Sequence, residues 1–163
     1  MSQYFAALVA RRGTKWSGSE LDVEEHEDLD AVVDAIRDEA DGELALLFVE
    51  QGDEYFLVVR VDSDGDARTF ISDVRAIDTF PLAAMIMEDE VPVIRPDDDD
   101  DEDSVRPESQ PAGDGKILAD LGLSEEQLLE LCGEEGMLPA DVITAACEKA
   151  GCADVLEEIR ETG

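Results

Sequence analysis

The residues of this chain that could perform acid–base or metal chemistry are one histidine, three cysteines and many carboxylates. His26 lies within the acidic run 24–28, where carboxylates could raise its pKa or join it as metal ligands. There is no second histidine, and no cysteine lies near His26 in the sequence. The sequence therefore favours a solvated His26 ahead of a helix over a catalytic or metal-binding one.

The three cysteines, Cys132, Cys147 and Cys152, lack the spacing of a metal site. A structural zinc ion normally takes four ligands from closely spaced pairs. Cys147 and Cys152 stand five residues apart, and only one further cysteine exists. We expect these cysteines to pack as small hydrophobic residues, without bound zinc and without a disulfide framework.

Asp62, Asp64 and Asp66 have the opening spacing of a calcium-binding loop. Such a loop needs glycine at its sixth position and glutamate at its twelfth. Those positions are Ala67 and Asp73 here, and apolar strand-like runs flank the segment. The segment is therefore predicted to be a hairpin turn.

Other signatures of chemistry are also missing from the sequence. It has no phosphate-binding glycine-rich loop, no Gly-x-Ser-x-Gly motif and no paired histidine ligands. We found no basic patch with interleaved aromatic residues of the kind that binds nucleic acid. We expect no catalytic residue, cofactor or metal, which favours a non-catalytic protein over an enzyme.

The charge of the chain says more about its partners. Acidic residues number 44 and basic ones 12, a formal net charge of −32 that is spread over most of the length and is not confined to a tail. Such a field repels nucleic acid and anionic membranes and attracts basic protein surfaces. The densest acid is an unbroken run, a candidate site for a basic partner: Asp97, Asp98, Asp99, Asp100, Asp101, Glu102 and Asp103.

That run also bears on how the chain divides. Prolines and glycines surround it, so residues 96–115 are predicted to be a solvated, self-repelling linker. We expect an α/β domain at 1–95 and a helical segment at 116–163. The apolar stretches are too short to span a membrane and the first residues do not resemble a signal peptide, so a cytoplasmic location is expected.

Apolar periodicity predicts the elements that must position any site. Strands are expected at 4–10, 16–23, 44–49, 55–61 and 68–71, and helices from residue 28 and over 81–87. Ser124 and Gln127 form a capping-box pattern before one C-terminal helix, Pro139 and Asp141 open a second, and 153–159 makes a third. The fold class is therefore α/β, a largely antiparallel sheet with one or two packed helices and a small C-terminal helical segment. The expected core includes Phe5, Leu8, Val33, Ile36, Leu46, Phe48, Phe56, Val58 and Ile71.

Four segments of the sequence are distinctive: the run 4–10, the hairpin 53–62, the strand 70–73 and the segment 119–123. Together they resemble the tRNA adenosine deaminase-associated protein family of actinobacteria. The resemblance covers most of the chain except the acidic linker. It implies association with the deaminase that converts adenosine to inosine in tRNA, and it implies no activity or catalytic residue of this protein's own.

The sequence also separates this chain from the deaminase itself. A zinc nucleobase deaminase needs His-x-Glu and Pro-Cys-x-x-Cys. Glu27 directly follows His26, one place too early, and no Cys-x-x-Cys occurs. Two hypotheses remain: a non-catalytic partner or regulator with an acidic docking surface, or a small-molecule or cation-binding domain or unrecognised enzyme whose acid serves solubility. The charge could also reflect a high-salt or acidic-proteome lifestyle.

Overall fold

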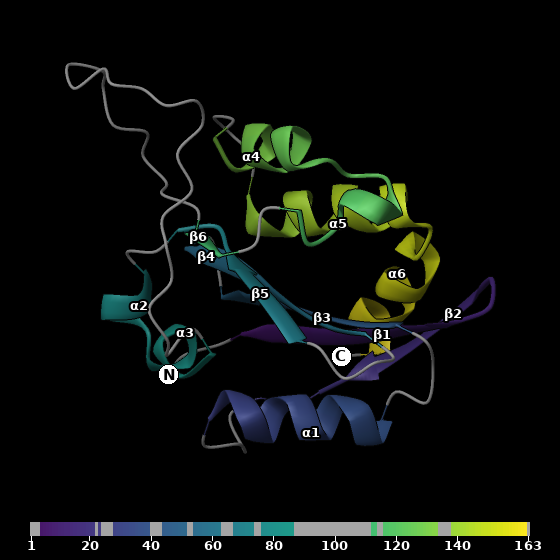
Figure 1. Cartoon of the computed structure of the whole chain (residues 1–163), viewed down its shortest axis with the longest axis horizontal. Helices are drawn as coiled ribbons and strands as arrows, with labels where there is room; N and C mark the ends of the chain where they lie inside the picture. The colour runs from purple at the N-terminus through teal and green to yellow at the C-terminus, as the bar shows by residue number, and fades with distance from the viewer. Residues whose placement is uncertain are drawn as a thin grey trace.

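The computed structural model describes residues 4–21, 23, 28–39, 44–51, 54–62, 67–73, 76–86, 112–113, 116–133 and 138–162. Six strands form one antiparallel sheet in the order β2-β1-β3-β4-β5-β6 (Figure 1). Their bounds are β1 Phe5–Arg12, β2 Lys15–Glu20, β3 Leu44–Gln51, β4 Tyr55–Asp62, β5 Ala67–Ile71 and β6 Ala112–Gly113. The five predicted strands are confirmed, and β6, within the predicted linker, is an addition.

The central strands are apolar because both faces of the sheet are covered. Alternate residues of a strand point to opposite faces. On β3, Leu47 and Val49 belong to one buried cluster, and Leu46 and Phe48 belong to another. A strand that is apolar at nearly every position is therefore buried on both faces of the sheet, as the sequences of β3 and β4 require.

Helix α1 (Leu29–Glu39) covers one face of the sheet (Figure 1). The Asp28 carboxylate caps its start by accepting a hydrogen bond from Ala31 N at 2.9 Å; the sequence offered Asp28 or Asp30 for this role. Val32 and Ile36 are fully buried against the strands. Two short helices, α2 (Ala76–Thr79) and α3 (Pro81–Ile86), complete this layer.

Three C-terminal helices lie on the opposite side of the sheet, the second and third against the strands and the first against the second. They are α4 (Glu125–Gly133), α5 (Pro139–Ala150) and α6 (Ala153–Thr162), preceded by the short 3-10 helix η2 (Ala119–Leu121). Ser124 and Gln127 form the predicted capping box, with bonds of 3.1 and 3.2 Å. Leu128, Ile143 and Leu156 share one apolar cluster with strand residues.

The predicted core is confirmed with one difference. Eight of the nine expected residues are buried, and Phe5 is half-buried beneath the Arg160 side chain. Helices from both ends of the chain pack on one sheet, so the fold is a three-layer α/β arrangement. The division into 1–95, 96–115 and 116–163 stays a prediction, because most of the linker lies outside the described residues.

No helix among the described residues is long and apolar enough to cross a membrane.

Candidate functional site

The outer face of the three C-terminal helices is acidic. Helices α4, α5 and α6 carry nine carboxylates, and all but one of these residues are exposed. The same helices contain only two cations, Lys149 and Arg160. We call this the C-terminal acidic surface; its exposed members are Glu126, Glu130, Asp141, Glu148, Asp154, Glu157, Glu158 and Glu161.

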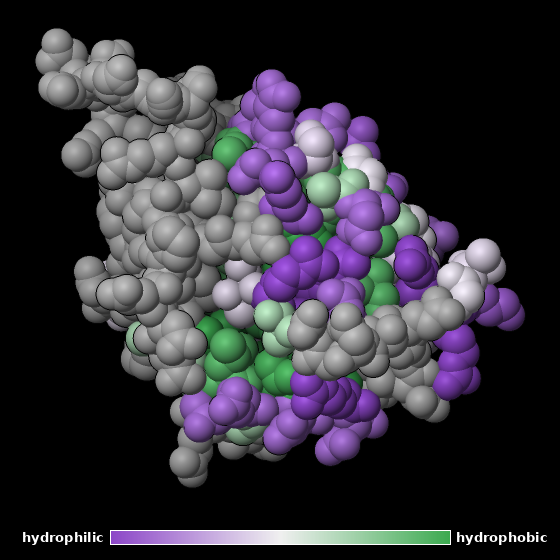
Figure 2. Space-filling view, in the orientation of Figure 1, coloured by the Kyte–Doolittle hydropathy of each residue, from purple (hydrophilic) through white to green (hydrophobic). Residues whose placement is uncertain are grey.

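Amphipathic packing explains why the acid gathers there. The apolar stripes of α5 and α6 face the sheet and that of α4 faces α5, so the polar positions of these helices face outward. Helix α1 follows the same rule on the opposite layer, where Asp30, Asp34 and Asp38 are exposed. Hydrophilic residues accordingly lie over both helical layers in Figure 2.

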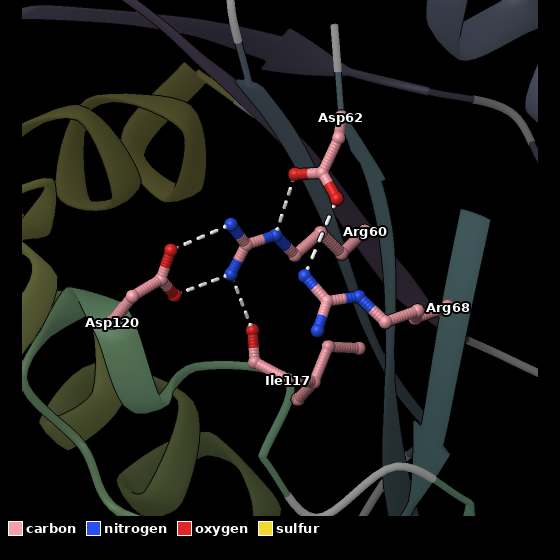
Figure 3. A network of polar contacts seen from close by, with 5 residues as sticks. All are labelled: Arg60, Asp62, Arg68, Ile117 and Asp120. Atoms are coloured by element: carbon pink, nitrogen blue, oxygen red, sulfur yellow. Dashed lines mark hydrogen bonds and ion pairs between the residues drawn. The ribbon is translucent and has the colours of Figure 1, made fainter. Parts of the chain in front are cut away.

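A buried arginine joins the sheet to the C-terminal segment. Arg60, near the end of β4, donates from Nη1 to the Ile117 carbonyl at 2.7 Å (Figure 3). Its guanidinium also binds the Asp120 carboxylate at two points, Nη1–Oδ1 at 2.6 Å and Nη2–Oδ2 at 2.8 Å. Nε donates to Asp62 at 2.9 Å, and Asp62 accepts a further bond from Arg68 at 3.2 Å. We call Arg60, Asp62, Ile117 and Asp120 the arginine clamp.

The burial and hydrogen bonding of Arg60 give the arginine clamp a structural role. The Arg60 side chain is only 6% exposed, and each of its three guanidinium nitrogens donates to an acceptor. Its hydrogen bonds to Asp120 raise the pKa of Arg60 and lower that of the Asp120 carboxyl. A guanidinium held this way stays charged, and four of its five N–H groups are bonded to acceptors of the fold.

A second ion pair fixes the last helix. Arg160 on α6 donates to Glu50 on β3 at 2.7 and 3.3 Å, and its guanidinium lies 4.5 Å from the centre of the Phe5 ring. Glu50 is 13% exposed at its side chain, so the pair is largely shielded from water. Arg160 is therefore committed to packing, which leaves Lys149 as the exposed cation of the C-terminal acidic surface.

The remaining buried polar side chains also serve the fold. Tyr55 donates to Gln51 at 2.8 Å, and burial raises the pKa of the tyrosine. Ser72 accepts a bond from Phe56 N at 3.0 Å. Within the described ranges, one buried side-chain nitrogen, Nε of Arg11, has no hydrogen-bond partner.

The cysteines lie where the sequence places them, against the apolar cluster. Cys147 and Cys152 are buried, and the backbone of Cys152 donates to the Cys147 carbonyl at 2.9 Å in the turn that ends α5. Apolar contact between these two positions is usual in such a helix ending. The hydrogen bond with Cys152, together with burial, raises the pKa of Cys147. Burial raises the pKa of Cys132 to about 12.

Several residues singled out in the sequence fall outside the described ranges. They are His26, Asp64, Asp66 and the run Asp97–Asp103, so their proposed roles stay predictions. Asp62 is described, and its two arginine partners occupy both of its oxygens. The strands on either side pair antiparallel, Val61 with Ala67, as a hairpin requires. No group of three or more potential metal ligands occurs among the residues that the structure covers.

The sequence analysis did not identify the arginine clamp, although one residue of the sequence indicated it. Arg60 is the one charged residue within the otherwise apolar run 55–61, and a buried charge needs a partner. Asp62 lies two residues on, on the same face of β4. The partner in η2 could not be foreseen, because it depends on how the C-terminal segment crosses the sheet.

The comparisons with known proteins add a family. No curated protein and no solved structure shows a significant match to the chain. A family model described as "Rv3753c-like tRNA adenosine deaminase-associated protein" matches residues 4–153, which include the whole sheet and most of the C-terminal helices. The chain therefore belongs to this family of tRNA adenosine deaminase-associated proteins, as its short sequence segments suggested.

Proposed function

We propose that this protein is a non-catalytic, cytoplasmic accessory protein that binds tRNA adenosine deaminase through its C-terminal acidic surface. The observation that carries the proposal is the concentration of eight exposed acidic residues on α4, α5 and α6, with Lys149 as their one exposed cation among the described residues. The family description supplies the partner to test first. An enzyme that binds tRNA needs a basic surface, which this acidic surface complements.

The non-catalytic part rests on what the polar side chains do. The clamp arginine, the Tyr55–Gln51 pair and Ser72 are all hydrogen-bonded inside the fold. These groups bind to one another or to the backbone within the fold. Binding to a partner therefore suits the described polar residues better than a reaction does.

Charge complementarity predicts how the interaction depends on salt. Screening shortens the range of exposed charges from about 10 Å at 0.1 M to about 3 Å at 1 M ionic strength. Affinity for the deaminase should therefore fall steeply between these conditions, mostly through slower association. A titration of the purified deaminase at several salt concentrations measures this directly.

Paired variants test which surface binds. Glu157→Lys with Glu161→Lys reverses charge on α6, and Asp34→Lys with Asp38→Lys makes the same change on α1, across the sheet. We expect the α6 pair to weaken binding by about tenfold or more and the α1 pair to change it much less. Competition with tRNA would show that both ligands use one face of the deaminase. Absence of binding at low salt, with deaminase activity unchanged by this protein, would refute the proposal.

A further inference from the structure

The N-terminal hairpin differs in charge from the rest of the molecule. All 44 acidic residues fall within 20–163, whereas residues 1–19 contain Arg11, Arg12 and Lys15 and no carboxylate side chain. The three cations gather at the turn between β1 and β2, where Gly13 has a φ of 66°. Positive φ at the first turn position suits glycine in a two-residue hairpin. The turn thus concentrates positive charge at one end of an acidic protein.

Strand β2 is also the edge of the sheet in the described structure. The strand order begins with β2, which pairs on one side with β1. Its pairing with β1 runs one-to-one from Lys15 to Glu20, without a bulge, and it contains no proline. Proteins usually protect an edge by proline, a bulge or central charges. Here the only charges of β2 stand at its two ends.

The register shows which backbone groups point outward. Leu21 N donates to Ala6 O at 3.3 Å, so odd-numbered residues of β2 direct their N–H and C=O groups toward β1. Trp16, Gly18 and Glu20 therefore direct theirs away from the sheet. These three residues offer a short row of donors and acceptors to another strand.

Packing holds this edge in place from one side. A Cβ on Gly18 would lie 2.7 Å from Val155 Cγ1 and 2.8 Å from Ile159 Cδ1, so the strand backbone lies directly against α6. Trp16 lies under the Arg11 guanidinium, at 5.7 Å, and its ring nitrogen faces the turn at Gly151. The indole of Trp16 therefore already packs against Arg11 and the turn at Gly151, which argues against stacking on a nucleic-acid base. Backbone pairing is the binding mode that the edge leaves available.

We propose that β2 is a second docking surface, at which an extended, acidic segment of a partner protein adds to the sheet as a further strand. The partner segment must be extended, because only an extended backbone can pair with the outward N–H and C=O groups of β2. The partner segment is expected to be acidic, because the hairpin cations attract carboxylates and the remainder of the molecule repels them. This surface adjoins α6, which carries part of the C-terminal acidic surface. Its binding groups are the β2 backbone and the hairpin cations, so it does not depend on the function proposed above.

Peptide binding tests the proposal without knowledge of the natural partner. The probe is a labelled ten-residue peptide of alternating Glu and Val, measured by fluorescence anisotropy on the full chain. A peptide of alternating Glu and Pro has the same charge and cannot pair as a strand, so it should not bind. Hydrogen exchange should slow at Trp16, Gly18 and Glu20 when the Glu-Val peptide is added. The inward-facing amides of Ser17 and Ser19 should change little.

Two variants separate backbone pairing from charge. Glu20→Pro removes an outward donor and leaves the ladder to β1 intact, with Glu20→Ala as its control; it should weaken Glu-Val binding about threefold to tenfold. Lys15→Glu should weaken binding about as much, whereas Lys149→Glu, the same charge change at an exposed residue of α5, should not. Thermal melting verifies that each variant is folded, and the exchange experiment needs no variant.

Three results would overturn the assignment. The first is no Glu-Val binding at millimolar peptide, or binding that spares the exchange of Trp16, Gly18 and Glu20. The second is binding of tRNA that Lys15→Glu abolishes, without peptide binding, which would assign the hairpin to RNA. The third is a dimer of this chain that Glu20→Pro dissociates, without peptide binding, which would make a second copy the occupant.

Discussion

Arg60 and Asp120 lie 60 residues apart in the sequence and bind each other at two points, with nitrogen–oxygen distances of 2.6 and 2.8 Å. The arginine is buried, and the aspartate side chain is 62% exposed. The pair therefore connects η2, at the start of the C-terminal segment, to a buried charge on β4. Ile117, which accepts from the same guanidinium, is itself fully buried.

Replacing Asp120 should loosen this tie without destroying the fold. Asp120→Ala leaves Arg60 with Asp62 and the Ile117 carbonyl, so we expect a loss of about 1–2 kcal/mol in the free energy of unfolding, moderated by the exposure of Asp120. Urea denaturation measures it. Glu157→Ala makes the same charge change at an exposed position on α6 and should leave stability unchanged. Equal effects of the two variants would mean that net charge, and not the clamp, sets the result.

The same pair predicts a pH dependence. The arginine lowers the pKa of the Asp120 carboxyl below its ordinary value of 3.8. A depressed folded-state pKa stabilises the protein above the unfolded pKa and is lost as pH falls through the folded one. The stability gap between wild type and Asp120→Asn should thus stay constant above about pH 5 and shrink below about pH 4. A gap that widens in acid would contradict the sign of this shift.

Local patterns predicted the centre of the sheet because β1, β3 and β4 are apolar at nearly every position. Leu46, Phe48 and Val58 have no exposed surface, and continuous burial of this kind is visible in a single run of sequence. Caps were equally readable, since Asp28 and Ser124 act within three residues of their own position. These features need no knowledge of distant parts of the chain.

The candidate surfaces were less accessible to the same reasoning. The sequence pointed to the run Asp97–Asp103 because its charge is contiguous, whereas the C-terminal acidic surface is assembled from single carboxylates on three helices. The role of Gly18 depends on the contact of α6 with β2, between residues more than 130 positions apart. Such relationships arise from tertiary packing, which spacing along the chain does not encode.

The cysteines should react slowly in the native protein. Burial raises the pKa of Cys132 to about 12, and the pKa of Cys147 is raised as well, so little of their reactive thiolate forms at pH 8. The hydrogen bond with Cys147 lowers the pKa of Cys152, but the Cys152 side chain is fully buried and closed to the reagent. We expect an aromatic disulfide reagent to modify all three thiols in denaturant and to react far more slowly without it. Cys132→Ala should reduce the denatured count to two. A native thiol that reacts as fast as free cysteine would show that the C-terminal helices open readily.

A charge placed in the sheet should abolish folding. Val58 on β4 is fully buried in the cluster that joins the strands to the C-terminal helices. Val58→Asp would bury an unpaired carboxylate at a cost of several kcal/mol, comparable with the whole stability of a small protein. Circular dichroism should show no cooperative melting, whereas Val58→Ala should melt cooperatively at a lower temperature. Wild-type melting of Val58→Asp would refute the strand assignment.

Gly18 should be the position of β2 least tolerant of a methyl group. An added Cβ would stand 2.7 Å from Leu8 O and from Val155 Cγ1, closer than packed atoms normally approach. Gly18→Ala must therefore displace α6 or the strand, and we expect it to lower the unfolding free energy by about 1–3 kcal/mol. Ser17→Ala and Ser19→Ala, exposed neighbours on the same strand, should have little effect.

A double variant shows whether α6 is the element that Gly18 accommodates. Val155→Ala removes one of the two α6 methyl groups that the new Cβ would strike, whereas Ile159 Cδ1 and the Leu8 carbonyl remain. The effects of Gly18→Ala and Val155→Ala should therefore be non-additive, with the double variant more stable than their sum predicts. Strictly additive losses in urea denaturation would mean that α6 does not lie against β2 in solution.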